Sequence, residues 1–287
     1  MFEIVYQFDP TGHLTPQMPA NAPEARRRLE QGNRDFAIDL DPSTLTQPVR
    51  RVHRVDANEL GLPGPDGRPP TQQPFAAVLG CADARVPTEM VFGQGCNDLF
   101  VVRVAGNVLG SECLGSLDYA LSNLGDSLHL VVVLGHSGCG AVTAAVDSFL
   151  SPTQYLAYAP RHPLRAIIDR LMVPVRAAQL AVESTWGHAA TGKPGYRKAL
   201  IETAVGLNAA LTAATIRQEL RDQLGTQREV VYGVYDLLSR RVGIPIGVPG
   251  GAPSVAGLVA PPPDLSGFDH LAIAIATSPP VSDLLRS

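Results

Sequence analysis

The sequence has few cysteines and no long apolar run, and each shortage excludes a class of protein. Its 287 residues include four cysteines, too few for the disulfide framework of a small secreted domain. No stretch reaches the roughly 18 consecutive apolar residues of a spanning helix, so we expect no membrane partner. The N-terminus MFEIVYQFDP has no basic segment before an apolar core, so we expect no secretory signal. These shortages predict a protein of a reducing compartment, the cytoplasm.

An excess of either charge is also missing. The formal net charge is −4, and the sequence contains no long basic stretch. The local cluster Arg26–Arg28 falls in a helical pattern, where a solvated helix face is expected. We therefore expect no nucleic-acid partner. What the chain does have is 45 % apolar and 17 % charged residues, a balance that predicts a packed globular core.

Local signals divide the first quarter of the chain. Residues 1–20 predict an irregular arm. Asn21-Ala22-Pro23-Glu24 is typical of a helix start, with Asn as cap, Pro in the first turn and Glu three residues on, and the helix should run to about Phe36. Residues 39–74 are rich in Pro, Gly, Asp and Arg, with GLPGPDGRPP at 61–70, and predict an inserted surface loop.

The middle of the chain alternates strand and helix signals. Strands are expected at 75–79, 98–104, 128–134 and 229–238, and helices at 87–92, 111–124, 140–150, 164–183 and 197–224. Strands as apolar as Leu-Val-Val-Val-Leu are buried on both faces. The fold class predicted is α/β: one domain over residues 1–242, with a mainly parallel sheet flanked by helices. Residues 243–287 form a Pro/Gly-rich C-terminal extension of unknown role, with a late edge strand at 270–277.

Three potential metal ligands follow two of these strands. The tripeptide Val-Leu-Gly ends both apolar runs, at 78–80 and 133–135; Cys81 follows the first, and His136 and Cys139 follow the second. Because parallel strands end at the same sheet edge, two thiolates and an imidazole should meet there. Three such ligands with a fourth position left open indicate a catalytic zinc site, with one Zn²⁺ per chain.

A carboxylate and a guanidinium stand next to this cluster in the sequence. Asp83 and Arg85 lie two and four residues after Cys81, on the same strand-end loop. A carboxylate there accepts a hydrogen bond from metal-bound water, or occupies the open position itself. Arg85 would hold Asp83 in place and keep it ionised.

Three blocks of the sequence resemble the signature blocks of the β-class carbonic anhydrases. They are CADARVPTEMVFGQG (81–95), DLFVVRVAGNV (98–108) and VVLGHSGCGAV (132–142). A weaker similarity extends over about residues 22–242. The sequence departs from the family at Ala84, where the family usually has serine, and residues 243–287 have no counterpart that we can place.

The resemblance implies reversible hydration of carbon dioxide to bicarbonate, in a homodimer or a dimer of dimers. It makes Cys81, His136 and Cys139 the zinc ligands, and Asp83 and Arg85 the catalytic pair. Gln94 matches a glutamine that reaches across a dimer interface toward substrate, and Gly138 lies in the loop beside the metal. Backbone N–H groups near Gly138 and the amide of Gln94 would steady negative charge on the substrate oxygen. The RVAGN block resembles the subgroup with water in the fourth position, so Asp83 should be paired with Arg85.

Three other functions remain open on sequence grounds. The same zinc site could hydrolyse carbonyl sulfide or carbon disulfide, since pocket width and not the ligand set would decide. Gly135-His136-Ser137-Gly138-Cys139 nearly matches the G-x-S-x-G elbow of α/β-hydrolases, but ends in Cys instead of Gly. The chain could also be a non-catalytic zinc-binding family member with a structural role.

Overall fold

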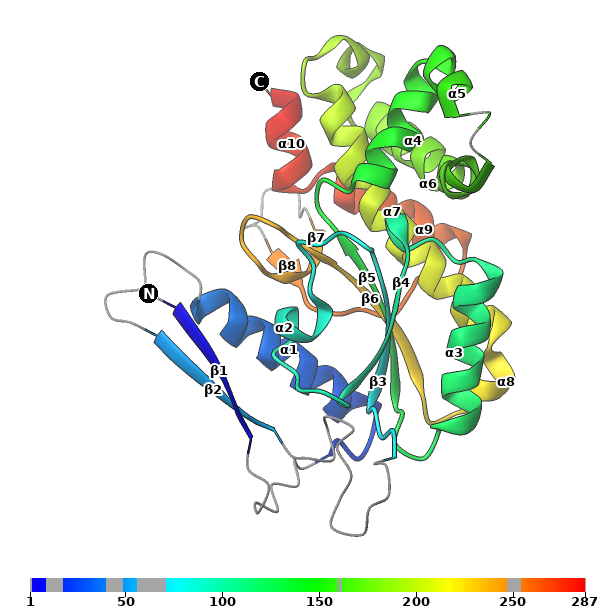
Figure 1. The fold of residues 1–287 in the computed structure, drawn as a ribbon. Coiled ribbons are helices and arrows are strands. Elements are labelled where there is room, and N and C mark those ends of the chain that lie inside the picture. Colours follow the sequence, from blue (N-terminus) through cyan, green and yellow to red (C-terminus); the bar gives the residue numbers. More distant parts are fainter. Residues whose placement is uncertain are drawn as a thin grey trace.

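A mostly parallel sheet forms the centre of the protein (Figure 1). The computed structural model describes residues 2–8, 18–39, 49–55, 71–158, 160, 162–246 and 254–286. Within them, six strands follow the order β4-β3-β5-β6-β7-β8. Their bounds are β3 (Ala76–Gly80), β4 (Leu99–Arg103), β5 (Leu130–His136), β6 (Glu229–Tyr235), β7 (Val242–Ile246) and β8 (Ser254–Ala256). The first four are mutually parallel, and β7 and β8 add antiparallel pairs. The predicted fold class is confirmed.

The central strands are buried on both faces. Residues of β3 and β5 alternate between two apolar clusters: Ala77, Leu79, Val131 and Val133 point to one, and Ala76, Val78, Leu130 and Val132 to the other. Successive side chains of a strand face opposite sides of the sheet, so an unbroken apolar run supplies both cores. Helices must therefore cover each face.

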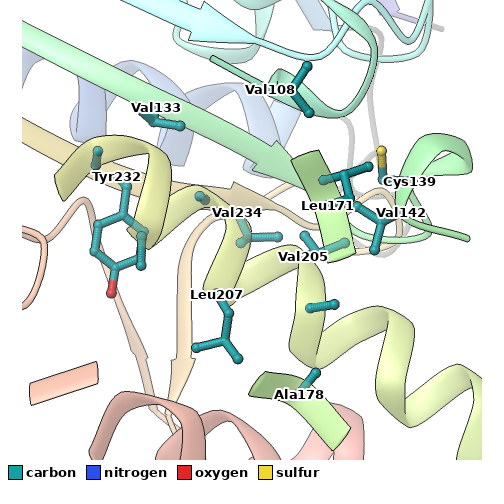
Figure 2. Packing of buried hydrophobic residues seen from close by; sticks show 14 of the residues in the cluster. Val108, Val133, Cys139, Val142, Leu171, Ala178, Val205, Leu207, Tyr232 and Val234 are labelled. Carbon is teal, nitrogen blue, oxygen red and sulfur yellow. The ribbon is translucent and has the colours of Figure 1, made fainter. Parts of the chain in front are cut away.

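Different helices cover the two faces (Figure 1). One cluster contains α1 (Ala22–Asp39) and α2 (Thr88–Val91). The other contains α3 (Ser111–Asn123), α4 (Gly140–Leu150), α6 (His162–Trp186) and α7 (Tyr196–Glu219). The short helix α5 (Pro152–Tyr158) contacts α4, and the short helix α8 (Arg221–Leu224) contacts α3 and α7. Figure 2 shows residues of the larger cluster, among them Val133 of β5, Val205 and Leu207 of α7, and Cys139.

Helix α7 is the most deeply embedded of these elements. It is long and apolar enough to cross a membrane by length and composition, yet 78 % of its most apolar window is buried inside the protein. It contacts β5, β6, α6, α9 and α10. Its apolar character is therefore accounted for by core packing.

The predicted start of α1 is confirmed. The Asn21 side chain accepts the Glu24 N–H at 3.0 Å, and the Glu24 carboxylate accepts the Ala20 N–H at 2.9 Å. These bonds satisfy N–H groups that a helix start leaves without partners. The helix continues to Asp39, one turn beyond the predicted end near Phe36.

Two predictions for the N-terminal quarter were wrong. Part of the predicted irregular arm is the strand β1 (Phe2–Phe8), and part of the predicted loop insertion is β2 (Val49–Val55). The two strands pair in parallel, with Phe2 opposite Val49. This pairing joins segments far apart in the sequence, which local composition does not reveal. The segment GLPGPDGRPP lies outside the described residues.

The C-terminal extension is helical where a strand was predicted. Residues 270–277 fall largely in α9 (Leu265–Ala276), which α10 (Pro279–Arg286) follows. The alternation of Leu271, Ile273 and Ile275 suggested a strand, but Ala272, Ile275 and Ala276 are the buried side chains, at helical spacing. Asp264 caps the helix by accepting the Gly267 N–H at 2.8 Å. The extension begins inside β7 and packs on α6 and α7.

Candidate metal centre

The sheet brings the three predicted ligands to one edge. In the β3–β5 register Gly80 lies opposite Leu134, so Cys81 leaves β3 beside the last residues of β5. His136 ends β5, and Cys139 is the residue before the first turn of α4. The duplicated Val-Leu-Gly ends thus reflect two neighbouring strands that stop nearly level. The predicted convergence is confirmed.

The ligand atoms of this Cys–His–Cys cluster (Cys81, His136 and Cys139) lie close enough together to hold one metal ion. They all lie within 4.8 Å of one another, and the two sulfurs are 3.9 Å apart. Two sulfurs bound tetrahedrally at about 2.3 Å from one zinc ion would lie roughly 3.8 Å apart. Nδ1 of His136 bonds the Ser137 carbonyl at 3.0 Å, which leaves Nε2 as the free lone pair. That Nε2 is fully buried and has no hydrogen-bond partner, so the donor set fits a zinc ion.

The contact between the two sulfurs shifts their pKa values in opposite directions. The Cys139 thiol, the nearby His136 imidazole and the Gly106 N–H favour the charged form of Cys81, and they lower its pKa against the opposing effect of burial. The Cys81 sulfur and burial raise the pKa of Cys139. Burial opposes a charge on His136, but the Cys81 sulfur and the Ser137 carbonyl outweigh it and raise the imidazole pKa. A divalent cation would take the place of these protons.

Asp83 and Arg85 form the predicted pair at the rim of the cluster. Arg85 donates from Nε to Oδ1 of Asp83 at 3.0 Å and from Nη2 to Oδ2 at 2.7 Å. Hydrogen bonds from the Arg85 side chain and backbone hold the pKa of Asp83 well below its usual range, despite the opposing effect of partial burial. Oδ2 of Asp83 lies 3.7 Å from Nε2 of His136. The carboxylate is therefore ionised and next to the ligand atoms.

Arg103 holds the loop that carries this pair, and the sequence analysis missed it. From the end of β4 its guanidinium donates to the Cys81 carbonyl at 2.9 Å and to the Asp83 carbonyl at 2.5 Å. The signal was a single charge in the apolar run Phe-Val-Val-Arg-Val. Arg103 thus fixes the backbone on both sides of Ala82.

Gly138 lies beside the cluster as predicted, but its N–H is already bonded. It donates to Oε1 of Glu202, on α7, at 3.1 Å. The Gly138 backbone has φ +62°, a left-handed conformation that glycine adopts readily. Burial raises the pKa of Glu202, although the bond from Gly138 opposes the shift. Glu202 was not predicted from the sequence, although it is the one charged residue in the stretch 199–216 of α7. Donation from Gly138 to a substrate would require this bond to open.

Gln94 is buried, and its side chain bonds to residues outside the Cys–His–Cys cluster. Its Oε1 accepts from Nε of Arg28 at 2.8 Å, and its Nε2 donates to the Phe92 carbonyl at 2.6 Å. Arg28 also bonds Asp98 at 2.8 Å. Among the described contacts, the amide is thus engaged by α1 and its own turn. A role of Gln94 across a dimer interface stays a prediction.

Ser137 does not have the surroundings of a hydrolase nucleophile. Its hydroxyl accepts the Leu237 N–H at 2.9 Å. The neighbouring imidazole of His136 faces the two cysteines and bonds only the Ser137 carbonyl among the described contacts. This hydroxyl therefore has no general base, which argues against the G-x-S-x-G alternative.

Comparison with known proteins places these residues in one family. The family model described as carbonic anhydrase matches residues 76–239, more than half of the chain. "Carbonic anhydrase 2" of Mycobacterium tuberculosis is 53 % identical over 155 residues, which cover 54 % of this chain and 65 % of that relative. A carbonic anhydrase of Mycolicibacterium smegmatis is 49 % identical over 77 residues, covering 27 % of this chain and 36 % of the relative. The aligned segments thus span less than two thirds of these relatives.

Similar solved structures have lower identity. The β-carbonic anhydrase CcaA is 20 % identical, with a TM-score of 0.46, over 67 % of this chain and 85 % of that one. One of two structures described as tetrameric β-carbonic anhydrases, from Sordaria macrospora, is 20 % identical, with a TM-score of 0.42, over 60 % of this chain and 80 % of that one.

Proposed function

We propose that this chain, which belongs to the β-class carbonic anhydrase family, is a zinc lyase that catalyses the reversible hydration of carbon dioxide to bicarbonate and a proton. The observation that carries the proposal is the meeting of Cys81, His136 and Cys139 beside the ionised Asp83. A structural zinc site would normally have four protein ligands. Three ligands beside a restrained carboxylate suit catalysis.

Cys81, His136 and Cys139 would hold the zinc ion. When bound, zinc supplies a Lewis acid that lowers the pKa of a coordinated water and so provides a nucleophile at neutral pH. The remaining chemistry belongs to the protein. Cys139 and Cys81 are at most 5 % exposed and His136 is fully buried, so the ligand side of the site excludes bulk water.

Asp83 would orient the attacking oxygen. Both of its carboxylate oxygens accept from Arg85, so its position is fixed before substrate arrives. From there it accepts the O–H of the nucleophile, which turns an oxygen lone pair toward the carbon of carbon dioxide. The reaction converts carbon dioxide and water into bicarbonate and a proton, and the proton leaves to solvent. Arg103 keeps the loop in register by bonding two of its carbonyls.

The cellular setting and assembly are part of the proposal. Zinc binding requires reduced thiols, and the four cysteines, all of them within the described residues, form no disulfide, which supports a reducing compartment such as the cytoplasm. A homodimer or dimer of dimers follows from the family resemblance. Light scattering coupled to size-exclusion chromatography would measure the assembly.

The test is stopped-flow hydration of carbon dioxide by the zinc-loaded protein, with Asp83→Asn as the variant. We expect the variant to keep one zinc per chain and to lose turnover on the order of a hundredfold, because the neutral amide no longer accepts from the nucleophile in the same way. Turnover unchanged at full zinc content would refute the role of Asp83.

The same preparation separates the remaining alternatives. A zinc-loaded wild-type protein without hydration activity would favour a structural role in the family. Hydrolysis of carbonyl sulfide or carbon disulfide faster than hydration of carbon dioxide would assign the site to those gases. Activity toward carbon dioxide alone supports the proposal.

A further inference from the structure

Helix α7 carries two polar side chains that bond to the backbone next to the proposed sulfur ligands. Asn208 is 4 % exposed and donates from Nδ2 to the Gly106 carbonyl at 2.8 Å. Glu202 accepts the Gly138 N–H at 3.1 Å. The bond from Asn208 ends at Gly106, which contacts Cys81. The bond to Glu202 comes from Gly138, the residue before Cys139. Neither side chain contributes to the function proposed above.

The Asn208 bond bears on Cys81 through a single glycine. The Gly106 N–H donates to Sγ of Cys81 at 3.3 Å, and Gly106 has φ +69°. A glycine has wide backbone freedom, so its N–H needs an external restraint to stay aimed at the sulfur. The bond from Asn208 to the Gly106 carbonyl provides that restraint. A hydrogen bond to a thiolate stabilises its charged form, which is the form that binds metal.

The Glu202 bond bears on Cys139 in a similar way. A Cβ placed on Gly138 would meet no atom within 4 Å, so packing does not restrain this turn on that side. The carboxylate of Glu202 bonds the turn one residue before Cys139. Ser137 is tied separately to β6 and the residues after it, through the Tyr235 carbonyl and the Leu237 N–H. Glu202 is thus the side chain that attaches the Gly138 peptide to α7.

We propose that α7 positions both thiolates of the metal centre, Asn208 through Gly106 and Glu202 through Gly138. Both are positioning residues, since neither touches the substrate or the metal. The inference rests on the proposed zinc site, and it adds that the core helix restrains the sulfurs and slows loss of the ion. Partners of metal ligands outside the coordination sphere typically change affinity by roughly 10- to 100-fold when they are removed.

The experiment measures zinc rather than turnover. Purified zinc-loaded protein is mixed with excess EDTA, and the rate of zinc loss is followed for wild type, Asn208→Ala, Glu202→Ala and Glu202→Gln. We expect zinc loss on the order of tenfold faster in the two alanine variants. Glu202→Gln keeps a carbonyl acceptor for the Gly138 N–H and should stay near the wild-type rate. In cobalt-substituted protein, the sulfur-to-cobalt absorption band should shift in the alanine variants only.

Thr203→Val is the matched control. Thr203 lies on the same helix, is fully buried, and its hydroxyl has no partner among the described residues. The substitution is nearly isosteric and should leave both the zinc-loss rate and the cobalt band unchanged. If Asn208→Ala does not fold, Glu202→Ala and its glutamine rescue decide the proposal, because Glu202 is less buried than Asn208.

The outcomes separate this inference from the proposed function. Alanine variants that lose zinc at the wild-type rate, with an unshifted cobalt band, overturn the positioning role while the zinc site stands. Faster zinc loss in Thr203→Val as well would assign the effect to helix stability and overturn it too. A wild-type chain that takes up no zinc overturns both proposals. Zinc held tightly without hydration activity contradicts only the proposed function.

Discussion

A buried tyrosine and a glutamate show how single residues tie the helices together away from the metal centre. Tyr196, at the start of α7, donates to Oε1 of Glu183 on α6 at 2.8 Å, and Gln179 donates to the same oxygen at 2.8 Å. The bond from Tyr196 is the largest cause that lowers the pKa of Glu183, ahead of Gln179 and His188, while burial opposes it. A carboxyl with a lowered folded-state pKa stabilises the fold above its unfolded pKa. That contribution is lost as the pH falls through the folded-state value.

Tyr196→Phe should therefore destabilise the protein in a pH-dependent way. At pH 7 we expect a loss of about 1 to 2 kcal/mol, because a hydrogen bond to an ionised group is removed. The deficit should shrink below the usual glutamate pKa of about 4.3 as Glu183 becomes protonated. Urea unfolding at pH 7 and at acid pH measures both values. Tyr119→Phe is the control, since Tyr119 is 53 % exposed. Equal deficits for Tyr196→Phe at both pH values would contradict the coupling to Glu183.

At this scale the sequence predicted the residues that stand at strand ends and little of what supports them. Cys81, His136 and Cys139 could be placed together because parallel strands end at one edge of the sheet. The roles of Arg103, Glu202 and Asn208 depend on which backbone groups lie within reach after folding. No local sequence pattern predicts which backbone groups these side chains will bond. Their only trace was a polar residue inside an apolar run.

At the scale of the elements, helix α1 approaches the turn after α2 very closely at Gly32. A Cβ placed there would lie 1.8 Å from the Phe92 carbonyl oxygen and 2.9 Å from Nε2 of Gln94. The helix can therefore lie against the turn after α2 only with glycine at this position. Asn33, the next residue, donates to the Val91 carbonyl at 3.0 Å and accepts the Val242 N–H at 2.7 Å. Close approach and these bonds dock α1 on the sheet.

Gly32→Ala should destabilise the protein by about 1 to 3 kcal/mol or more, because the backbone of one element has to shift. Gly115→Ala, in α3, should instead stabilise it by roughly 0.5 to 1 kcal/mol, the difference in helix propensity. A Cβ on Gly115 would meet no atom within 4 Å. Denaturant unfolding of the two variants gives opposite signs. A Gly32→Ala variant with an unchanged free energy of unfolding would mean that α1 does not pack this closely against the turn after α2.

Elements with strong local signals were predicted well, and elements defined by distant partners were not. Apolar strands, the capped helix α1 and the helix α4 were predicted correctly within a few residues. The strand β2, Val-Arg-Arg-Val-His-Arg-Val, has three arginines and a histidine and pairs with β1. Helix α9 was mistaken for a strand because alternate apolar residues fit both periods over so short a stretch. Its capping Asp264 was the overlooked signal.

For the molecule as a whole, bound zinc should stabilise the fold. An ion that binds only the folded chain adds about 2.7 kcal/mol at a hundredfold excess over its Kd. We expect EDTA to lower Tm and added zinc to restore it. Cys139→Ser, which loses one ligand, should purify without stoichiometric zinc, and its Tm should not respond to EDTA. Thermal unfolding with metal analysis measures both. Full zinc content in Cys139→Ser would disprove the ligand assignment.

The pairing of β3 with β5 has a consequence for how the proposed zinc ion would be acquired. The two cysteines are 58 positions apart in the chain and become neighbours only when those strands pair. Before those strands pair, the chain offers the local pair His136 and Cys139 but not Cys81, so the full set of three ligands does not yet exist. We therefore expect tight zinc binding to follow assembly of the sheet. Until then these thiols are open to oxidation, and a chain oxidised at Cys81 or Cys139 would lack a thiolate ligand until it is reduced.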